Sequence, residues 1–230
     1  MARKMTSVGH GVVSRHRRGW AAVALALLVV AGCGGSDYKY VANRQHGNFF
    51  KVPTGWHLQN VTEADQEGRP KELPGGIVSV WHTVFDNAPS AGLPTLDGEQ
   101  LPEQVVGSAE IYAISDSYRE QFSMSKIREM AFNGVDPVFA PEELSPKVRL
   151  VTPGYTPLEG GDLNGSRVIA NMDIGEDGAP PRWMTVDVSM LFDNRTGRIF
   201  LLRMQCASTC YEQNRAAVDE IAASWTVKPS

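Results

Sequence analysis

Residues 183–206, with the sequence WMTVDVSMLFDNRTGRIFLLRMQC, decide the fold. Apolar and polar positions alternate in both halves of this segment; the apolar positions are Met184, Val186, Val188, Met190 and Phe192, then Phe200, Leu202, Met204 and Cys206. A period of two is typical of a β-strand with one buried face. The polar residues 193–197 between the halves predict a turn. We therefore expect an antiparallel hairpin whose apolar, even-numbered residues share one face of a sheet, covered by a helix.

Further strands are predicted on both sides of this hairpin. Residues 167–174 alternate in the same way, and 77–85 and 105–114 are also strand-like. Shorter candidates are 49–52, 56–61 and 224–227. Many of the fourteen prolines fall in stretches that we expect to be connections, namely 68–76, 87–104, 133–147, 152–165 and 175–181.

One helix is clearly indicated after the hairpin. Thr209 and Glu212 have the spacing of a capping box, and the next residues predict a helix over 211–223. Its inward face would carry Tyr211, Val218, Ile221, Ala222 and Trp225. A weaker helical pattern covers residues 117–131. The predicted fold class is α+β, a single domain with a mainly antiparallel β-sheet flanked by α-helices.

The N-terminal segment has the features of an export signal. A basic start without acidic residues precedes an apolar run of twelve residues, 20–31. Such a run is too short to span a bilayer, which takes about 20 residues, but it suits the central region of a signal peptide. The run ends in Val30-Ala31-Gly32-Cys33, which resembles the bacterial lipobox. An uncleaved anchor, an ordinary secretory signal and, through Arg17-Arg18, twin-arginine export are the alternatives.

The lipobox resemblance implies that Cys33 receives a diacylglyceryl group and becomes the new N-terminus. Several acyl chains bind a protein to a bilayer far more tightly than one chain, because each buried CH₂ contributes ~0.8 kcal/mol of binding free energy. The predicted organisation is a lipoprotein signal peptide at 1–32, a polar tether with lipidated Cys33 at 33–47, and the α+β domain at 48–230. The expected location is the extracytoplasmic face of the cell membrane, and the lipid on Cys33 makes the membrane a partner.

The net charge argues against two classes of partner. Five of the 22 basic residues and none of the 26 acidic residues lie before Cys33, so the mature chain carries 17 basic and 26 acidic residues, a net charge of −9. An acidic chain without a basic stripe is a poor candidate for binding nucleic acid. It is also a poor candidate for electrostatic binding to anionic lipid, so the lipid on Cys33 would have to provide the anchoring.

Two cysteines remain after lipidation of Cys33, namely Cys206 and Cys210. An exported protein can form disulfides, so we expect these two to pair. The loop is so short that the bond would add only ~2 kcal/mol by the chain-entropy estimate. Free thiols, or a metal or redox site, are the alternatives.

Both ends of the mature chain resemble PsbP-like domains, including the LpqN-type lipoproteins of mycobacteria and related actinobacteria. The resemblance lies in Phe49-Phe50-Lys51-Val52-Pro53-Thr54-Gly55-Trp56 and in the order of the later segments: 163–167 leading into a strand, hairpin 182–206, helix 211–223 and the closing sequence Ala223-Ser224-Trp225-Thr226-Val227. It implies an α/β/α sandwich and, for most such proteins, a non-catalytic binding or accessory role. Residues 62–160 depart from the pattern, and no residue of the photosystem role of PsbP is carried over.

Motifs of common catalytic sites are absent from the sequence. It contains neither the G-x-S-x-G of serine hydrolases nor the H-E-x-x-H of zinc peptidases. The mature chain has three histidines, His46, His57 and His82, which we interpret as surface or core residues. The acidic residues of 173–177 lack the alternation of a calcium loop. We therefore assign no catalytic, cofactor-binding or metal-binding residue and expect no enzyme.

The functional prediction is a membrane-anchored, non-catalytic binding or accessory module. It would hold a cell-envelope protein, a polymer or a small ligand, with the loops at 87–104 and 133–165 as the contact surface. Residues 123–136, where Lys126, Arg128 and Glu129 look exposed beside Met130 and Phe132, are where we expect an apolar patch. The alternatives are an envelope hydrolase assembled around His82 or His57, and a structural surface lipoprotein without a specific ligand.

Overall fold

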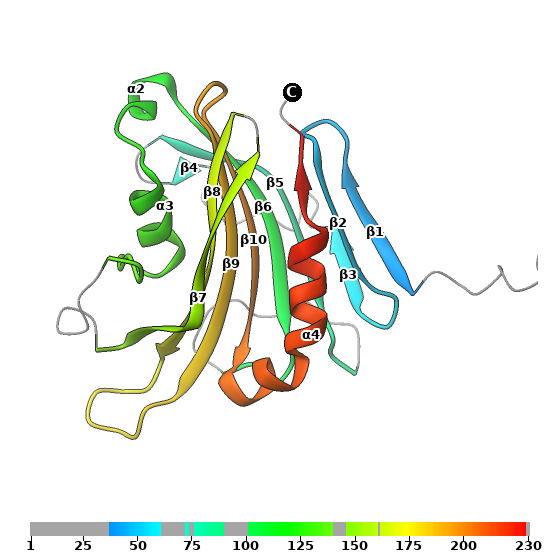
Figure 1. Cartoon of the computed structure of the whole chain (residues 1–230), viewed down its shortest axis with the longest axis vertical. Coiled ribbons are helices and arrows are strands. Elements are labelled where there is room, and N and C mark those ends of the chain that lie inside the picture. Colours follow the sequence, from blue (N-terminus) through cyan, green and yellow to red (C-terminus); the bar gives the residue numbers. More distant parts are fainter. Residues whose placement is uncertain are drawn as a thin grey trace, which may run out of the picture. The chain divides into compact units, whose positions relative to one another are not determined.

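A computed structural model describes residues 37–60, 72–73, 76–89, 101–139, 146–160 and 162–228. The predicted signal peptide 1–32 and Cys33 lie outside the described residues. The elements, shown in Figure 1, are β1 Tyr38–Asn43, β2 Asn48–Pro53, β3 His57–Asn60, β4 Glu72–Leu73, β5 Ile77–Asp86, β6 Val106–Ile114, α2 Asp116–Arg119, α3 Met124–Ala131, β7 Val148–Gly160, β8 Leu163–Asp173, β9 Trp183–Asp193, β10 Arg198–Ala207, α4 Ser208–Ser224 and β11 Thr226–Val227.

Two antiparallel sheets form the framework. The larger sheet has eight strands in the order β3-β5-β6-β10-β9-β8-β7, with β4 paired to β5. The smaller sheet has the order β1-β2-β11. The hairpin predicted over 183–206 is confirmed as β9 and β10 at the centre of the larger sheet, where Asp193 pairs with Arg198.

The larger sheet is flanked by helices on both faces. On one face α3 packs with Ile127, Ala131 and Phe132 against residues of β8 and β9. On the other face α4 packs against β9, β10 and β2. In Figure 1 the sheet accordingly lies between α3 and α4. The predicted fold class, an α+β domain with a mainly antiparallel sheet between helices, is therefore confirmed.

Even-numbered residues of β9 and even-numbered residues of β10 lie on opposite faces of the sheet. Because Asp193 pairs with Arg198 across the four residues Asn194–Gly197, each even residue of β9 lies opposite an odd residue of β10. Directly opposite residues point to the same side of a sheet. Met190 of β9 and Leu201 of β10 thus face α3, whereas Leu202 and Met204 lie in the core beneath α4. The prediction of one common even-numbered apolar face is wrong.

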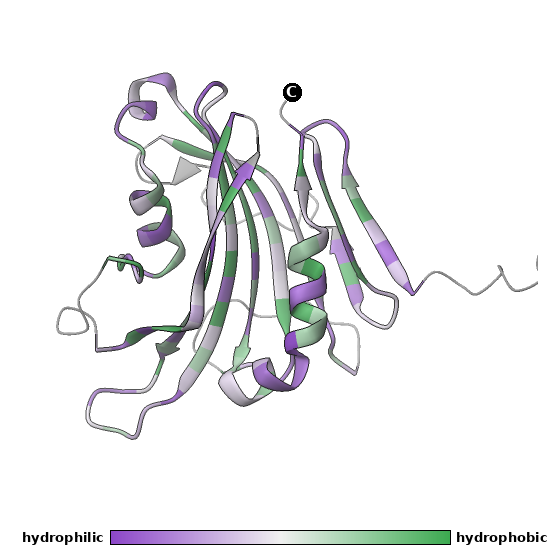
Figure 2. Cartoon of the chain, in the orientation of Figure 1, coloured by the Kyte–Doolittle hydropathy of each residue, from purple (hydrophilic) through white to green (hydrophobic). Residues whose placement is uncertain are grey.

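Both faces of β9 are buried, and the face beneath α4 is polar. All residues of this strand after Trp183 are buried. The face beneath α4 carries Thr185, Asp187 and Ser189. Figure 2 shows the matching pattern of hydrophobic and hydrophilic residues along the central strands and along α4. The polar face needs hydrogen-bonding partners, because an unpaired buried carboxylate is very costly.

A charged network beneath α4 supplies these partners. Arg167 of β8 donates two hydrogen bonds to the Asp187 carboxylate, Nε at 2.9 Å and a terminal nitrogen at 2.5 Å. The hydroxyl of Tyr211 in α4 donates to the same carboxylate at 2.8 Å. Arg167 also donates to Asp219 of α4 at 2.6 Å. Burial alone would lower the pKa of Arg167, but Asp187 and Asp219 raise it above its ordinary value, so the side chain stays charged.

The predicted helix over 211–223 is confirmed as α4, with a different start. Tyr211, Val218 and Ile221 are buried as expected. The helix begins at Ser208 after Ala207, and no side chain caps it, so the prediction of a Thr209–Glu212 capping box is wrong. The reason is that the chain enters the helix directly from the last residue of β10.

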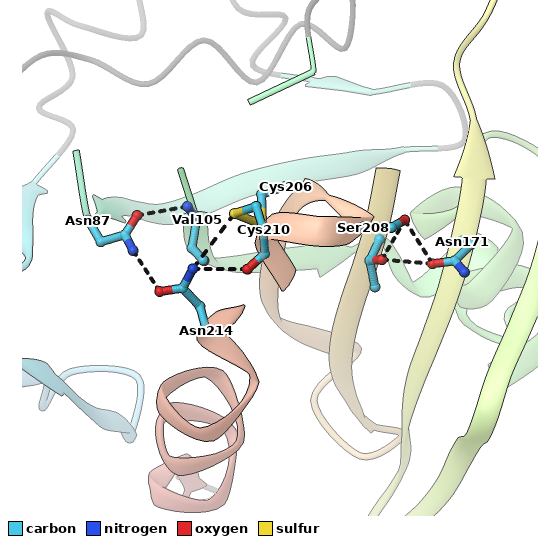
Figure 3. The surroundings of a disulfide bond; sticks show 8 residues. Asn87, Val105, Asn171, Cys206, Ser208, Cys210 and Asn214 are labelled. Atoms are coloured by element: carbon cyan, nitrogen blue, oxygen red, sulfur yellow. Dashed lines mark hydrogen bonds between the residues drawn. A yellow bond between two sulfur atoms is a disulfide. The ribbon is translucent and has the colours of Figure 1, made fainter. Parts of the chain in front are cut away.

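Cys206 at the end of β10 and Cys210 in the first turn of α4 form a disulfide bond, with their Cα atoms 6.0 Å apart. Asn214, one turn further along, donates to the backbone oxygen of Cys210 at 2.9 Å. Asn87 links this helix to the sheet, because it donates to Asn214 at 3.0 Å and accepts from the Val105 amide at 2.8 Å. Figure 3 shows these side chains around the bond. The disulfide and the two amides together fix the strand-to-helix turn.

Two segments that we expected to be irregular are strands. Residues 38–43, part of the predicted tether 33–47, form β1 and pair with β2 along their whole length. Much of the predicted connection 152–165 belongs to β7, an edge strand that contains Pro153 and Pro157. An edge strand tolerates proline because one of its sides has no partner strand. The predicted helix 117–131 is divided into α2 and α3.

Removing the arginine of the buried network should destabilise the fold. We expect Arg167→Met to lower the free energy of unfolding by about 3–5 kcal/mol, because it leaves the fully buried Asp187 without its cation. Asp219→Asn is the matched control. It removes the more exposed partner of the same arginine and should cost at most ~1 kcal/mol. Urea unfolding of both variants measures the difference, and equal losses would show that Asp187 does not depend on Arg167.

Reduction of the disulfide should have a small, defined effect. We expect the wild-type chain to lose ~2 kcal/mol of unfolding free energy in a thiol reductant, since a closed loop of this length constrains the unfolded chain only slightly. The variant Cys206→Ala/Cys210→Ala should show the same loss without reductant and no further change with it. If the unfolding midpoint of the wild type is the same with and without reductant, the two residues are free thiols.

Candidate functional site

A cavity lies where α3 ends and the chain turns back towards the sheet. The Ser123 side chain caps the start of α3 by accepting a hydrogen bond from the Lys126 amide at 3.2 Å. After Phe132, Asn133 and Gly134 adopt positive φ angles of 54° and 87°. The Gly134 amide donates to the Glu129 carbonyl at 2.7 Å, which closes the end of the helix. This left-handed turn directs residues 135–139 back across α3.

The cavity, here called the α3 pocket, has a volume of about 430 Å³. It is lined by Phe132, Asn133, Val135, Pro146, Lys147, Val148, Met172 and Asp173. Its walls thus come from the end of α3, the start of β7 and the end of β8. Apolar side chains form most of the wall, and Asn133, Lys147 and Asp173 supply polar groups. An apolar cavity with a few polar groups suits an amphipathic ligand.

A buried ion pair fixes the segment that forms one wall. The Asp136 carboxylate accepts two hydrogen bonds from Arg128 of α3, at 2.8 and 2.9 Å. It also accepts from the Ser125 hydroxyl at 2.6 Å and from the Val138 amide at 3.0 Å. Burial alone would raise the pKa of Asp136, but these donors, Arg128 foremost, lower it below its ordinary value. The pocket wall is therefore held by an ionised carboxylate.

The charged groups at the pocket rim already have partners. Lys147 pairs with Asp177 at 2.6 Å, and the hydrogen bond to that carboxylate raises the pKa of Lys147. The Asp173 carboxylate accepts from the Gly175 and Arg182 amides at 2.9 and 2.8 Å. These contacts organise the loop between β8 and β9. Among the described residues, no group of three or more His, Cys, Asp or Glu side chains is arranged to hold a metal ion.

Both histidines named for the hydrolase alternative have a carboxylate within reach. His57 Nδ1 lies 3.2 Å from Asp86, whose carboxylate also accepts from the Ala88 amide at 2.8 Å. His82 Nε2 lies 4.0 Å from Glu110. These pairs belong to β3, β5 and β6, whereas the α3 pocket is formed at β7 and β8, the opposite edge of the larger sheet. The structure does not bring the histidines together with this cavity.

Glu110 is poorly suited to act as a general base. Its carboxylate accepts from the Ser108 hydroxyl at 2.7 Å and from the Tyr112 hydroxyl. Burial alone would raise the pKa of Glu110, but the charge of Arg203 and the Tyr112 hydrogen bond lower it. A carboxylate with a lowered pKa accepts protons weakly.

Within 123–136, where an apolar patch was expected, Phe132, Asn133 and Val135 line the α3 pocket, and one expectation about this segment is wrong. Arg128 is buried rather than exposed, and Phe132 is buried with it. The pairing of Arg128 with Asp136 was missed, although an arginine beside the buried Ile127 and an aspartate shortly after the helix were visible in the sequence. The contribution of β7 could not be seen, because 133–165 was read as loop. The strand carrying Met172 and Asp173 was predicted, but no pattern placed it beside the end of α3.

Loss of the Asp136 charge should loosen the pocket wall. We expect Asp136→Asn to cost about 3–5 kcal/mol of unfolding free energy at neutral pH, since Arg128 is then buried without its anion. The pKa of Asp136 is lowered in the folded chain, so its stabilisation is present above pH ~4, the unfolded value, and decreases as the pH falls below it. The difference between wild type and variant should therefore shrink in acid. Lys126→Gln, which removes an exposed pair on the same helix, is the control and should cost at most ~0.5 kcal/mol.

Solved structures of similar fold include two of the kind that the sequence resembles. Cyanobacterial PsbP from Synechocystis shares 14% sequence identity, with a TM-score of 0.45 over 86% of this chain and 96% of that one. LpqN of Mycobacterium tuberculosis, described as involved in cell envelope biogenesis, shares 14%, with a TM-score of 0.46 over 84% and 91% of the two chains. The Saccharomyces cerevisiae Ran-binding protein Mog1p shares 12%, with a TM-score of 0.41 over 84% and 96%.

Comparisons of sequence alone gave no match. No protein-family model matches the chain, and no curated protein matches it. The likeness to PsbP and LpqN thus concerns the overall fold, and it agrees with the resemblance seen in residues 49–56 and 163–227.

Proposed function

We propose that this chain is a lipid-anchored, extracytoplasmic bacterial protein that acts as a non-catalytic binding or accessory module. In this proposal the α3 pocket binds an amphipathic component of the cell envelope, and the apolar part of that component fills the cavity. The component belongs to a lipid, a polymer or a protein. The α3 pocket itself is the observation on which the binding role depends.

The size and rigidity of the pocket support binding. A volume of about 430 Å³ lies within the ~300–1,000 Å³ usual for ligand sites. The buried Arg128–Asp136 pair holds the wall in place before a ligand arrives, and a preformed site loses less entropy on binding. Lys147 and Asn133 at the rim could meet a polar or anionic head group, because Lys147 is half exposed despite its pair with Asp177.

The anchor is supported by the lipobox at 30–33. None of the helices in the described part of the chain is long and apolar enough to cross a bilayer. In this proposal the acyl chains on Cys33 attach the chain to the membrane. Fractionation of cells expressing Cys33→Ala tests this directly: the variant should leave the membrane fraction, and retention like that of the wild type would contradict the lipid anchor.

Occupancy of the pocket can be tested with an amphipathic aromatic anion, anilinonaphthalene sulfonate. The wild type should bind this probe saturably, with the ring in the pocket and the sulfonate near Lys147. Val148→Phe fills the cavity and should weaken binding at least about tenfold, a loss of ~1.4 kcal/mol. Lys147→Gln should weaken it less.

The matched control is Val80→Phe, the same substitution at an exposed position on β5 that does not line the pocket. It should leave probe binding unchanged. Equal affinity in Val148→Phe and the wild type, with both chains folded by circular dichroism, would remove the pocket as the binding site.

A further inference from the structure

The outer face of the smaller sheet carries exposed aromatic side chains. In the register of β1 with β2, Tyr40 lies opposite Lys51 and Ala42 lies opposite Phe49, so these residues share one face. The opposite face carries Val41, Phe50 and Val52, which are buried in the core beneath α4. We call the solvent side, formed by Tyr38, Tyr40, Ala42, Phe49 and Lys51, the β1–β2 outer face.

Tyr40 is the most exposed large apolar side chain among the described residues, at 75%. Beside it lies an open groove of about 380 Å³, lined by Tyr40–Ala42, Phe49–Lys51 and Ser224. Apolar atoms dominate this lining. A tyrosine that projects from an apolar groove has an apolar ring and a polar tip, the combination that is enriched at membrane–water interfaces.

Two lysine side chains lie close to aromatic rings of this face. The Lys51 ammonium lies 3.9 Å from the centre of the Tyr38 ring, and that of Lys228 lies 5.5 Å from the Phe49 ring. Lys51 and Lys228 are the basic residues beside this face. Lys39 lies opposite the buried Val52 and donates to the Trp56 carbonyl, so it does not contribute to the outer face. Glu220 of α4 pairs with Lys51 at 3.0 Å and offsets one of these charges. In a mature chain of net charge −9, this face thus has a small local excess of positive charge.

The length of chain between Cys33 and β1 limits where this surface can lie. β1 begins at Tyr38, five residues after Cys33. Five residues reach at most ~18 Å when fully extended. If Cys33 carries lipid, as the proposed function requires, the start of β1 cannot leave the vicinity of the bilayer surface. The predicted tether of fifteen residues would have left the domain much freer.

We propose that the β1–β2 outer face docks on the anionic surface of the membrane that holds the lipid anchor. Tyr40 and Phe49 lie at the head-group level, and Lys51 and Lys228 extend along the rings towards phosphate groups. The short chain after Cys33 favours the bilayer over a protein as the occupant of this face. α3, whose end lines the α3 pocket, then lies across the larger sheet from the membrane, since α3 and β1 lie on opposite sides of that sheet in Figure 1.

The test uses the full lipidated protein in vesicles of phosphatidylglycerol and phosphatidylcholine that contain a head-group nitroxide quencher. Tyr40→Cys and, as control, Tyr155→Cys on β7 each receive a bimane fluorophore at an exposed site. Quenching should be strong at position 40 and weak at position 155. Lys51→Gln and Lys228→Gln should each weaken the contact by about fivefold, the contribution of one basic side chain at an anionic surface. In vesicles of phosphatidylcholine alone the two lysine variants should match the parent chain.

Other outcomes overturn the proposal. Equal quenching at positions 40 and 155 means that the domain has no fixed orientation. Weak quenching at position 40 together with crosslinks between copies means that a second chain covers the face. The Cys33→Ala chain distinguishes failure of the docking from failure of the anchor. If the wild type leaves the vesicles as readily as Cys33→Ala, the lipid anchor is wrong. If the wild type stays on the vesicles without quenching at position 40, only the docking is refuted. Unfolding midpoints of the labelled chains confirm that each is folded.

Discussion

The carboxylate of Asp187 is fully buried between the larger sheet and α4, and much of the molecule is arranged to satisfy it. Arg167 reaches it from β8, and the Tyr211 hydroxyl reaches it from α4. Because these donors come from separate elements, the buried carboxylate links α4 to the sheet. The chain leaves α4 directly into β11, which pairs with β2. The position of the smaller sheet therefore depends on the same buried charge.

A second buried carboxylate has the same role on the other side of the sheet. Asp136 binds Arg128 of α3 and fixes the segment that closes one side of the α3 pocket. In both networks an apolar contact brings the elements together and a charged contact selects the geometry, since a buried charge tolerates little displacement from its partner. One network orders α4 and the smaller sheet, and the other orders the pocket.

The sequence predicted those elements whose structure depends on local pattern. The strands at 183–206 and the inward face of α4 followed from alternation and helical spacing, because these residues meet the core on regular elements. β1 was missed because only Val41 of its six residues is buried, so the strand shows little apolar alternation. β7 was missed because its prolines are characteristic of loops, and only its edge position permits them. The Arg128–Asp136 contact depends on a left-handed turn at Asn133 and Gly134, which no periodicity reveals.

The register between β9 and β10 sets which side chains the sheet presents to each helix. A slip of β10 by one residue against β9 would turn Leu202 and Met204 away from α4 and bring Cys206 to the opposite face of the sheet. Cys206 would then point away from Cys210 in the first turn of α4. The disulfide bond is therefore a covalent marker of the native register of the central hairpin.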